Sequence, residues 1–226
     1  MMIQNKKTIL RLVTLLVFIV PSICLAQAGK NDTQFWSETW IYAPKFNDKL
    51  DMGYTNYTRV GRNVSHITDE RQALFVTYTV MPELKFTQHL VFIEQDIPNA
   101  SKNDAIQYRP MTDASGVFDF TDIRLTYRAR VERQFRESLK DRWNFRPRVG
   151  FEIPFSVGDY KPYVFSNYEG FYNSDGRLWY RGRLLYGIGC PITPSLSLDL
   201  YGAKQMQRDP SQTDFDMFGF ILKIKT

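Results

Sequence analysis

Two opposite environments alternate residue by residue between Val117 and Phe155. From Asp122 the even positions are polar and rich in arginine, whereas the odd positions from Ile123 to Val131 are apolar. Successive side chains leave opposite faces of a strand, so a period of two predicts β-strands. An aromatic-rich face backed by a charged one is typical of a membrane barrel, which turns apolar side chains to lipid and polar side chains to its lumen.

The same period recurs along the chain in short runs that are separated by Pro, Gly, Asn and Asp. The pattern predicts strands near residues 33–43, 48–60, 71–81, 84–96, 117–136, 142–155, 160–173, 177–190, 195–206 and 213–225. A weaker run at 105–112 makes the count ten or eleven, and a short extra N-terminal strand would make it twelve. No helical period stands out. We therefore predict an all-β protein, an antiparallel up-and-down transmembrane β-barrel of 10–12 strands.

The connections between these runs are of two kinds. The tight ones lie at 44–49, 81–83 and 191–195, and the longer polar ones lie at 61–70, 97–104 and 207–213. Bacterial outer-membrane barrels have short periplasmic turns and long outer loops, which matches this contrast. A count of eleven strands places 44–49 and 191–195 at one end of the barrel, but it starts the first strand at the opposite, outer end.

The first residues are typical of an export signal. Three cations precede an apolar stretch at 12–25, and Ala26-Gln27-Ala28 follows as a cleavage site. We expect residues 1–28 to be removed as a signal peptide and residues 29–226 to form one barrel domain. The expected location is the bacterial outer membrane.

Charge and cysteine content exclude several classes of protein. The signal carries three cations and no anions, so its removal lowers the net charge from +5 to about +2 and leaves nucleic-acid binding without electrostatic support. Only Cys190 remains in the mature chain, so no intramolecular disulfide is expected. The sequence has no metal-ligand spacing and no cofactor motif, and we expect neither a metal nor a cofactor.

The charged positions of the predicted strands are the strongest chemical feature. Arginines in a lumen can draw anionic solutes through a pore. Alternatively, arginines and carboxylates on neighbouring strands pair with each other and stiffen a narrow barrel, and we favour this structural role. The predicted lumen residues are Arg124, Arg128, Arg130, Glu132, Arg146, Arg148, Glu152, Arg181, Arg183 and Asp199.

Two histidines are candidates for a catalytic base. A lipid-modifying hydrolase would need a histidine beside a serine or asparagine, with a carboxylate to orient it. His89 is expected to face the lumen, where Glu132 or Glu152 would approach it, whereas His66 lies beside Ser65 in a predicted loop. We treat His89 as the alternative base and polar packing in the lumen as its main role.

Aromatic residues near strand ends are expected to anchor the barrel at the two lipid interfaces, with sugar stacking as the alternative. They are Trp36, Trp40, Trp143, Trp179, Tyr180 and Tyr186.

Four short motifs carry a resemblance to a known family. They are Gln34-Phe35-Trp36-Ser37-Glu38, Arg128-Ala129-Arg130-Val131-Glu132-Arg133-Gln134-Phe135, Arg148-Val149-Gly150-Phe151-Glu152-Ile153-Pro154-Phe155 and Arg183-Leu184-Leu185-Tyr186-Gly187-Ile188-Gly189. Together they resemble the bacterial domain-of-unknown-function 2490 family (DUF2490), whose members are thought to be outer-membrane barrels. The resemblance implies a barrel in the cell envelope. It carries no catalytic residues and no ligand.

Three hypotheses about function follow. The first is a small outer-membrane barrel without enzymatic activity, which has a structural role or binds or passes a small solute through its Arg/Glu-lined lumen. Its expected partners are outer-membrane lipid and, during biogenesis, the barrel-assembly machinery. The second is a lipid-modifying hydrolase of the outer membrane. The third is a soluble periplasmic barrel that holds a lipid inside, which requires an apolar lumen and a polar outside.

Overall fold

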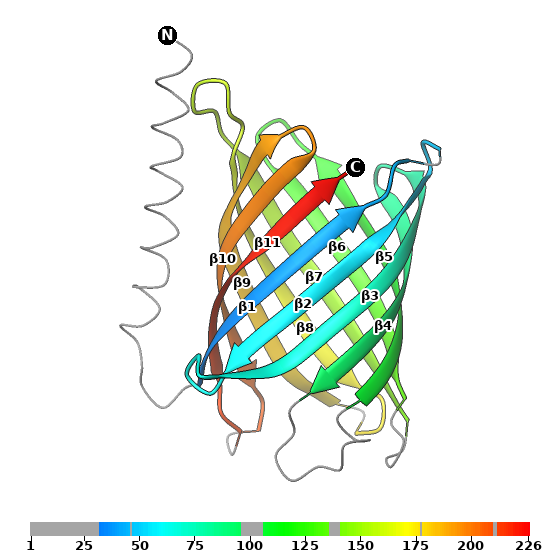
Figure 1. The fold of residues 1–226 in the computed structure, drawn as a ribbon, viewed down its shortest axis with the longest axis vertical. Coiled ribbons are helices and arrows are strands. Elements are labelled where there is room, and N and C mark those ends of the chain that lie inside the picture. The colour runs from blue at the N-terminus through cyan, green and yellow to red at the C-terminus, as the bar shows by residue number, and fades with distance from the viewer. Residues whose placement is uncertain (1–31, 46, 96–105, 136–140, 177, 210–211) are drawn as a thin grey trace.

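The computed structural model of the chain describes residues 32–45, 47–95, 106–135, 141–176, 178–209 and 212–226 (Figure 1). Eleven strands close into a single barrel, which confirms the predicted fold class. The strands are β1 (Asp32–Tyr42), β2 (Leu50–Gly61), β3 (His66–Met81), β4 (Leu84–Gln95), β5 (Ile106–Asp119), β6 (Arg124–Gln134), β7 (Arg142–Pro154), β8 (Tyr163–Asn173), β9 (Leu178–Thr193), β10 (Leu196–Gln207) and β11 (Phe215–Lys225). In this part of the chain no helix is long and apolar enough to cross a membrane. The predicted signal peptide lies outside the described residues.

The barrel closes through a parallel pair. β1 pairs with β11 from Asp32 opposite Phe215 to Tyr42 opposite Lys225, whereas every other neighbouring pair is antiparallel. Successive strands alternate in direction, so the first and the eleventh necessarily point the same way. β1 therefore begins at one end of the barrel and β11 finishes at the other.

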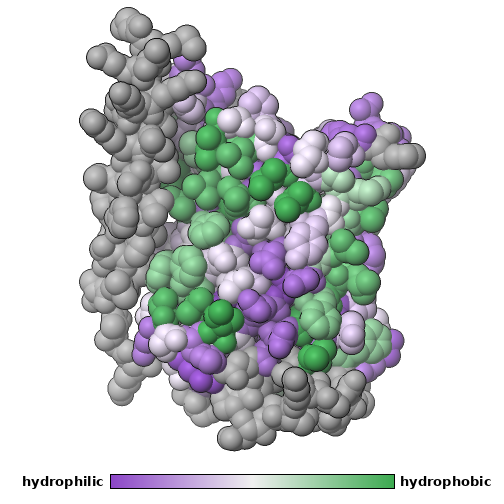
Figure 2. Space-filling model, in the orientation of Figure 1, coloured by the Kyte–Doolittle hydropathy of each residue, from purple (hydrophilic) through white to green (hydrophobic). Residues whose placement is uncertain are grey.

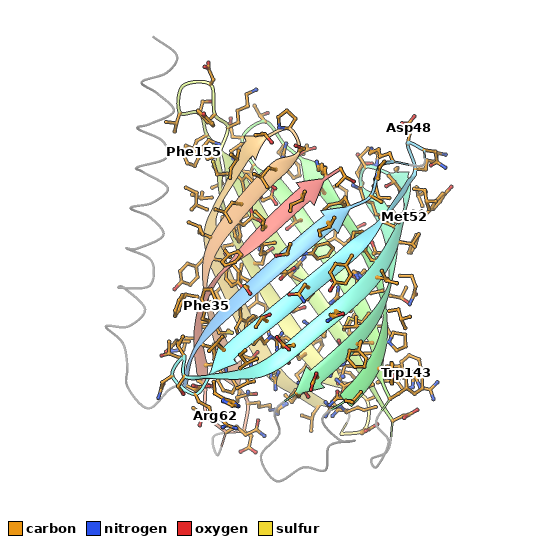
Figure 3. The ribbon with its side chains drawn as sticks, viewed as in Figure 1. Phe35, Asp48, Met52, Arg62, Trp143 and Phe155 are labelled. Atoms are coloured by element: carbon orange, nitrogen blue, oxygen red, sulfur yellow. The ribbon has the colours of Figure 1, made fainter. Side chains whose placement is uncertain are left out.

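The two ends carry different sets of connections (Figures 1 and 3). At the end where β11 finishes, marked by Asp48 in Figure 3, the connections are 43–49, 82–83, 120–123, 155–162 and 194–195. At the opposite end, marked by Arg62, they are 62–65, 96–105, 135–141, 174–177 and 208–214. We call these the turn end and the loop end. The three predicted tight turns share the turn end.

The long loop predicted at 61–70 is wrong. A turn of residues 62–65 joins β2 to β3, and its Arg62, Asn63 and Val64 have φ values of 51°, 55° and 62°. The backbone N–H of Asn63 donates to Asp32 Oδ1 at 2.8 Å. The start of β3 faces a polar lumen, so its composition imitates that of a loop.

The strand predicted at 117–136 is also wrong, because it spans a turn. β5 ends at Asp119, β6 begins at Arg124, and the N–H of Phe120 donates to the carbonyl of Ile123 at 2.9 Å. The alternation changes phase here: the even position 120 holds an apolar residue, whereas Asp122 opens the polar even series. A strand cannot exchange its two faces without such a break.

The outer wall of the barrel is largely apolar. Large apolar side chains are exposed on it, among them Leu74 at 63%, Leu90 at 59% and Val149 at 57%. Figure 2 shows apolar side chains spread over the visible wall and interrupted by polar ones. The buried residues, in contrast, include many arginines and carboxylates, which the alternation directs into the lumen.

The aromatic residues divide between the two faces. Trp143 and Trp179 are exposed on the wall near the loop end, where the guanidinium of Arg133 lies 5.4 Å from the Trp143 ring. Trp36 and Trp40 instead line the lumen, so the interfacial role predicted for them is wrong. The even positions of β1 face inward. Trp36 and Trp40 occupy even positions, as Glu38 does, and therefore point into the lumen.

Candidate functional site in the barrel lumen

The centre of the lumen is crossed by ion pairs between β6, β7 and β8. Arg146 donates through Nη1 to Glu132 Oε2 at 2.9 Å and through Nη2 to both carboxylate oxygens of Glu169 at 3.1 Å. Asn144 donates to the other oxygen of Glu132 at 3.0 Å. Charge-assisted bonds of this kind hold long side chains in one geometry, so Arg146 ties three strands together.

A second ion pair lies on the neighbouring strands β5 and β6. Arg130 donates through Nε and Nη2 to the two oxygens of Asp113 at 2.6 and 2.7 Å. His89 Nε2 lies 3.3 Å from Asp113 Oδ2, so the carboxylate partner of His89 is Asp113 and not the expected Glu132 or Glu152. β5 lies between β4 and β6, and this order brings Asp113 to both partners.

A third group occupies β2 and β3 near the loop end. Arg71 donates to the two oxygens of Asp69 at 2.6 and 2.5 Å, and Arg59 and Gln95 reach the same carboxylate at 3.3 and 2.9 Å. Sequence analysis missed Asp69 because it assigned residues 61–70 to a loop, and it did not count Arg71, the first residue of the strand predicted at 71–81, among the lumen residues. The odd parity that these two residues share with Ala73 and Phe75 was the available signal.

Aromatic rings form cation–π contacts with the arginines of the lumen. The guanidinium of Arg59 lies 3.8 Å and that of Arg183 4.7 Å from the ring of Trp36. Arg146 and Arg183 lie 4.6 and 5.0 Å from the ring of Phe171. Stacking on ring faces stabilises cations that have lost most of their water. We call Arg59, Asp69, Arg71, Glu132, Arg146, Glu169 and Arg183, together with these two rings, the charged layer.

Positive charge exceeds negative charge in and around this layer. Ten arginines of the described strands point into the central and loop-end lumen, against five carboxylates. The arginines are Arg59, Arg71, Arg109, Arg128, Arg130, Arg142, Arg146, Arg148, Arg181 and Arg183, and the carboxylates are Glu38, Asp69, Asp113, Glu132 and Glu169. The single carboxylate of Glu169 contacts three arginines, which are Arg146, Arg128 and, at 3.6 Å, Arg183.

The pairing of β6 with β7 places positively charged residues directly opposite each other. Arg128 stands directly opposite Arg148, and Arg130 stands directly opposite Arg146. Like charges that face each other across a ladder destabilise it. The positive charge of these arginines is compensated by Asp113 on β5 and Glu169 on β8. Sequence analysis did not include these two carboxylates among the predicted lumen residues.

The remaining predicted residues lie closer to the ends. Arg124 is at the turn-end rim, with 49% of its side chain exposed, and it contacts Asp119 at 2.9 Å and Glu152 at 3.8 Å. Arg181 donates to Gln207 at 3.2 Å. Asp199 accepts hydrogen bonds from Tyr163 and Lys223, both at 2.7 Å. His66 is exposed at the loop end.

Above the charged layer the lumen opens into a cavity of about 460 Å³, which we call the vestibule. Its lining on β4 runs from Lys85 to Val91, and on β6 it runs from Thr126 to Arg130. Arg59, Arg71, Arg146 and Arg183 of the charged layer form its floor. The lining thus belongs to the turn-end half of the strands, and the vestibule opens toward the turn end.

The vestibule wall is not uniform. On β8–β11 and β1 it includes a cluster of apolar and aromatic side chains, with Trp36, Phe165 and Tyr201 buried in it. On β6 and β7 it carries Arg128, Arg130 and Arg148. The described residues contain no group of three His, Cys, Asp or Glu side chains placed to hold a metal ion.

The fold and the lumen define a class: a closed eleven-stranded β-barrel with an apolar outer wall and a buried network of charges. The family described as "Protein of unknown function (DUF2490)" matches residues 33–216, and the chain belongs to this family. The resemblance found in the sequence is thereby confirmed.

Among solved structures, LpxR from Salmonella typhimurium is similar to this chain, with 9% sequence identity and a TM-score of 0.46. The alignment covers 78% of this chain and 82% of that chain. No curated protein matches the sequence.

Proposed function

We propose that this protein is a bacterial outer-membrane barrel without enzymatic activity, whose lumen is closed to free passage by the charged layer and holds a small solute in the vestibule. The observation that carries this proposal is the position of Arg146 between Glu132 and Glu169. These side chains are buried and span three adjacent strands, so an ion crossing the barrel would have to break charge-assisted bonds.

The outer wall supports the membrane location. Strands of 11 to 16 residues are long enough for a tilted strand to cross the hydrocarbon core. Exposed side chains such as Leu74, Leu90 and Tyr186 would be costly in water and are suited to lipid. A soluble lipid-binding barrel would need the opposite arrangement, with an apolar lumen and a polar wall.

The two ends suggest an orientation. The two shortest connections, 82–83 and 194–195, lie at the turn end, whereas the widest sequence gap between consecutive strands separates Gln95 of β4 from Ile106 of β5 at the loop end. Short turns face the periplasm in outer-membrane barrels. The vestibule would then open to the periplasm, with the charged layer between it and the outside.

Two measurements test the proposal. The full-length protein is expected in the outer-membrane fraction, and recovery in the osmotic-shock fluid without detergent would contradict the membrane location. In planar bilayers the refolded barrel is expected to carry no steady current. A stable ion conductance at neutral pH would show that the charged layer does not close the lumen.

A hydrolase remains the second candidate, because His89 has a carboxylate partner in Asp113. Asp113 is also bound at both oxygens by Arg130, which supports a packing role for the pair. Lipid A and phospholipid profiles of cells that carry His89→Gln or His66→Ala decide between the two roles. Unchanged profiles in both variants favour the non-enzymatic barrel, and a change in either supports the hydrolase.

A further inference from the structure

Two charged side chains in the middle of the vestibule form no ion pair within the part of the chain that the structure describes. Among the residues that the structure describes, Arg148 makes no hydrogen bond or ion pair, although it lines the cavity. Glu38 accepts hydrogen bonds from the indole N–H of Trp40 and from Tyr57, but it pairs with no cation. In contrast, each of the four arginines of the vestibule floor contacts a carboxylate.

The position of these two groups separates them from ordinary rim charges. Lys85 and Asp51 also lack ion pairs, but each is the second residue of its strand and lies at the mouth of the vestibule. Glu38 and Arg148 are each the seventh residue of their strands, β1 and β7. Water screens a charge at the mouth more than one in the interior, so the two half-buried interior charges are the ones best placed to bind a ligand in the cavity.

Glu38 and Arg148 stand on opposite walls. In the closed strand order, four strands separate β1 from β7 in one direction and five in the other. Arg148 faces Arg128 in the β6–β7 register and Glu169 in the β7–β8 register, and Glu169 is already shared by three other arginines. The unpaired charge is therefore positive on β7 and negative on β1 opposite it.

The surface between the two charges is mixed. Phe165, Leu185, Tyr201 and Ile221 line the vestibule on the strands that connect β7 to β1 through β8–β11. The charged residues of these strands that line it are paired with each other, Arg183 with Glu169 and Lys223 with Asp199. A ligand that spans the cavity would therefore meet a positive group at one end, apolar side chains and already paired charges along its body, and a negative group at the other end.

We propose that the vestibule binds a small organic zwitterion, with its carboxylate at Arg148 and Arg128 and its ammonium group at Glu38. This inference rests on the proposed solute-binding function and names the class of solute. Guanidinium–carboxylate and ammonium–carboxylate contacts are charge-assisted and strong where water is limited. An anion alone would leave Glu38 without an ion pair, and a cation alone would leave Arg148 without one.

A series of ω-amino acids tests the proposal as a molecular ruler. Binding of 4-aminobutyrate, 6-aminohexanoate and 8-aminooctanoate to the refolded full chain in detergent micelles is measured by calorimetry, with hexanoate and hexylammonium as single-charge probes. We expect one chain length to bind best and to exceed both single-charge probes by about tenfold or more, the effect of one additional charge-assisted contact.

Matched variants identify the two contacts. Arg148→Gln and Glu38→Gln should each reduce binding of the best amino acid by about tenfold, whereas Arg124→Gln at the rim should leave it unchanged. Glu38→Gln should leave hexanoate binding intact, and this result also shows that the variant is folded. Heat-modifiable migration on gels provides a second check of folding.

Three outcomes overturn the inference. Amino acids that bind no more tightly than hexanoate, and whose binding is insensitive to Glu38→Gln, reveal a simple anion site. Absence of binding by all probes to a folded barrel removes the ligand site. Equal loss in the Arg124→Gln control removes the assignment to Arg148. Membrane fractionation and conductance do not depend on any of these results, so failure here is distinguishable from failure of the proposed barrel function.

Discussion

Arg130 and Asp113 stand opposite each other in the β5–β6 ladder and form a two-pronged ion pair of 2.6 and 2.7 Å inside the barrel. Both side chains are less than 10% exposed. Removing one partner of such a pair leaves an uncompensated buried charge, whereas replacing both with apolar residues is often neutral. Replacing Arg130 alone should therefore destabilise the barrel more than replacing Arg130 and Asp113 together.

We expect Arg130→Met to lower the free energy of unfolding by about 3–5 kcal/mol and the double variant Arg130→Met/Asp113→Leu to recover most of it. Urea unfolding in lipid vesicles, followed by tryptophan fluorescence, measures both. Arg124→Met is the matched control, because its partner Asp119 is exposed at the rim, and a change within about 0.5 kcal/mol is expected there. Equal losses in the single and double variants would contradict the paired role.

The charged layer makes a prediction about conductance. The double variant Arg146→Ala/Glu132→Ala removes one charge of each sign and the volume of both side chains from the centre of the lumen. We expect it to carry a steady current in planar bilayers where the wild-type barrel does not. The rim variant Arg124→Ala/Glu152→Ala removes the same residue types and should remain closed. A central variant that is silent although folded would place the closure elsewhere in the barrel.

The apolar wall predicts a cost that depends on depth. Leu90 lies in the middle of β4 with 59% of its surface exposed, so Leu90→Arg is expected to lower barrel stability by about 2–4 kcal/mol in lipid vesicles. Ile67 lies at the start of β3 near the loop end, and Ile67→Arg should cost about 0–1 kcal/mol. Equal effects at the two positions would mean that the wall is not embedded in hydrocarbon.

The orientation of the barrel can be read with single cysteines in a Cys190→Ser background. Asp175 lies in a loop-end connection and Asp48 in a turn-end connection. A membrane-impermeant maleimide added to intact cells should label Asp175→Cys, and it should reach Asp48→Cys only after the outer membrane is permeabilised. The reverse pattern would turn the vestibule to the cell exterior.

The alternation of side chains was enough to predict the strands and the inward face of most charged residues. Arg146 and Glu132 were both expected in the lumen from their parity alone. The identity of partners was not predictable, because it depends on the register between strands: Arg128 was found opposite Arg148 and not opposite a carboxylate. A single strand carries no information about its neighbour's register.

The errors in strand assignment lie where a strand carries many polar residues toward the lumen, because such a segment has the composition of a loop. The start of β3 was assigned to a loop because Asp69 and Glu70 stand beside each other, although only Asp69 faces inward. The same ambiguity hid Asp113 on β5, where a weak run at 105–112 was separated from the continuation of its own strand. His89 consequently received the wrong carboxylate partner.

The parallel pairing of β1 with β11 has a consequence for how the strand number can change in evolution. Gain or loss of a whole hairpin keeps the count odd and leaves the two edge strands pointing the same way. Gain or loss of one edge strand makes the count even, and the barrel must then close through an antiparallel ladder. The β1–β11 seam is thus the place where a one-strand change would exchange one type of closure for the other.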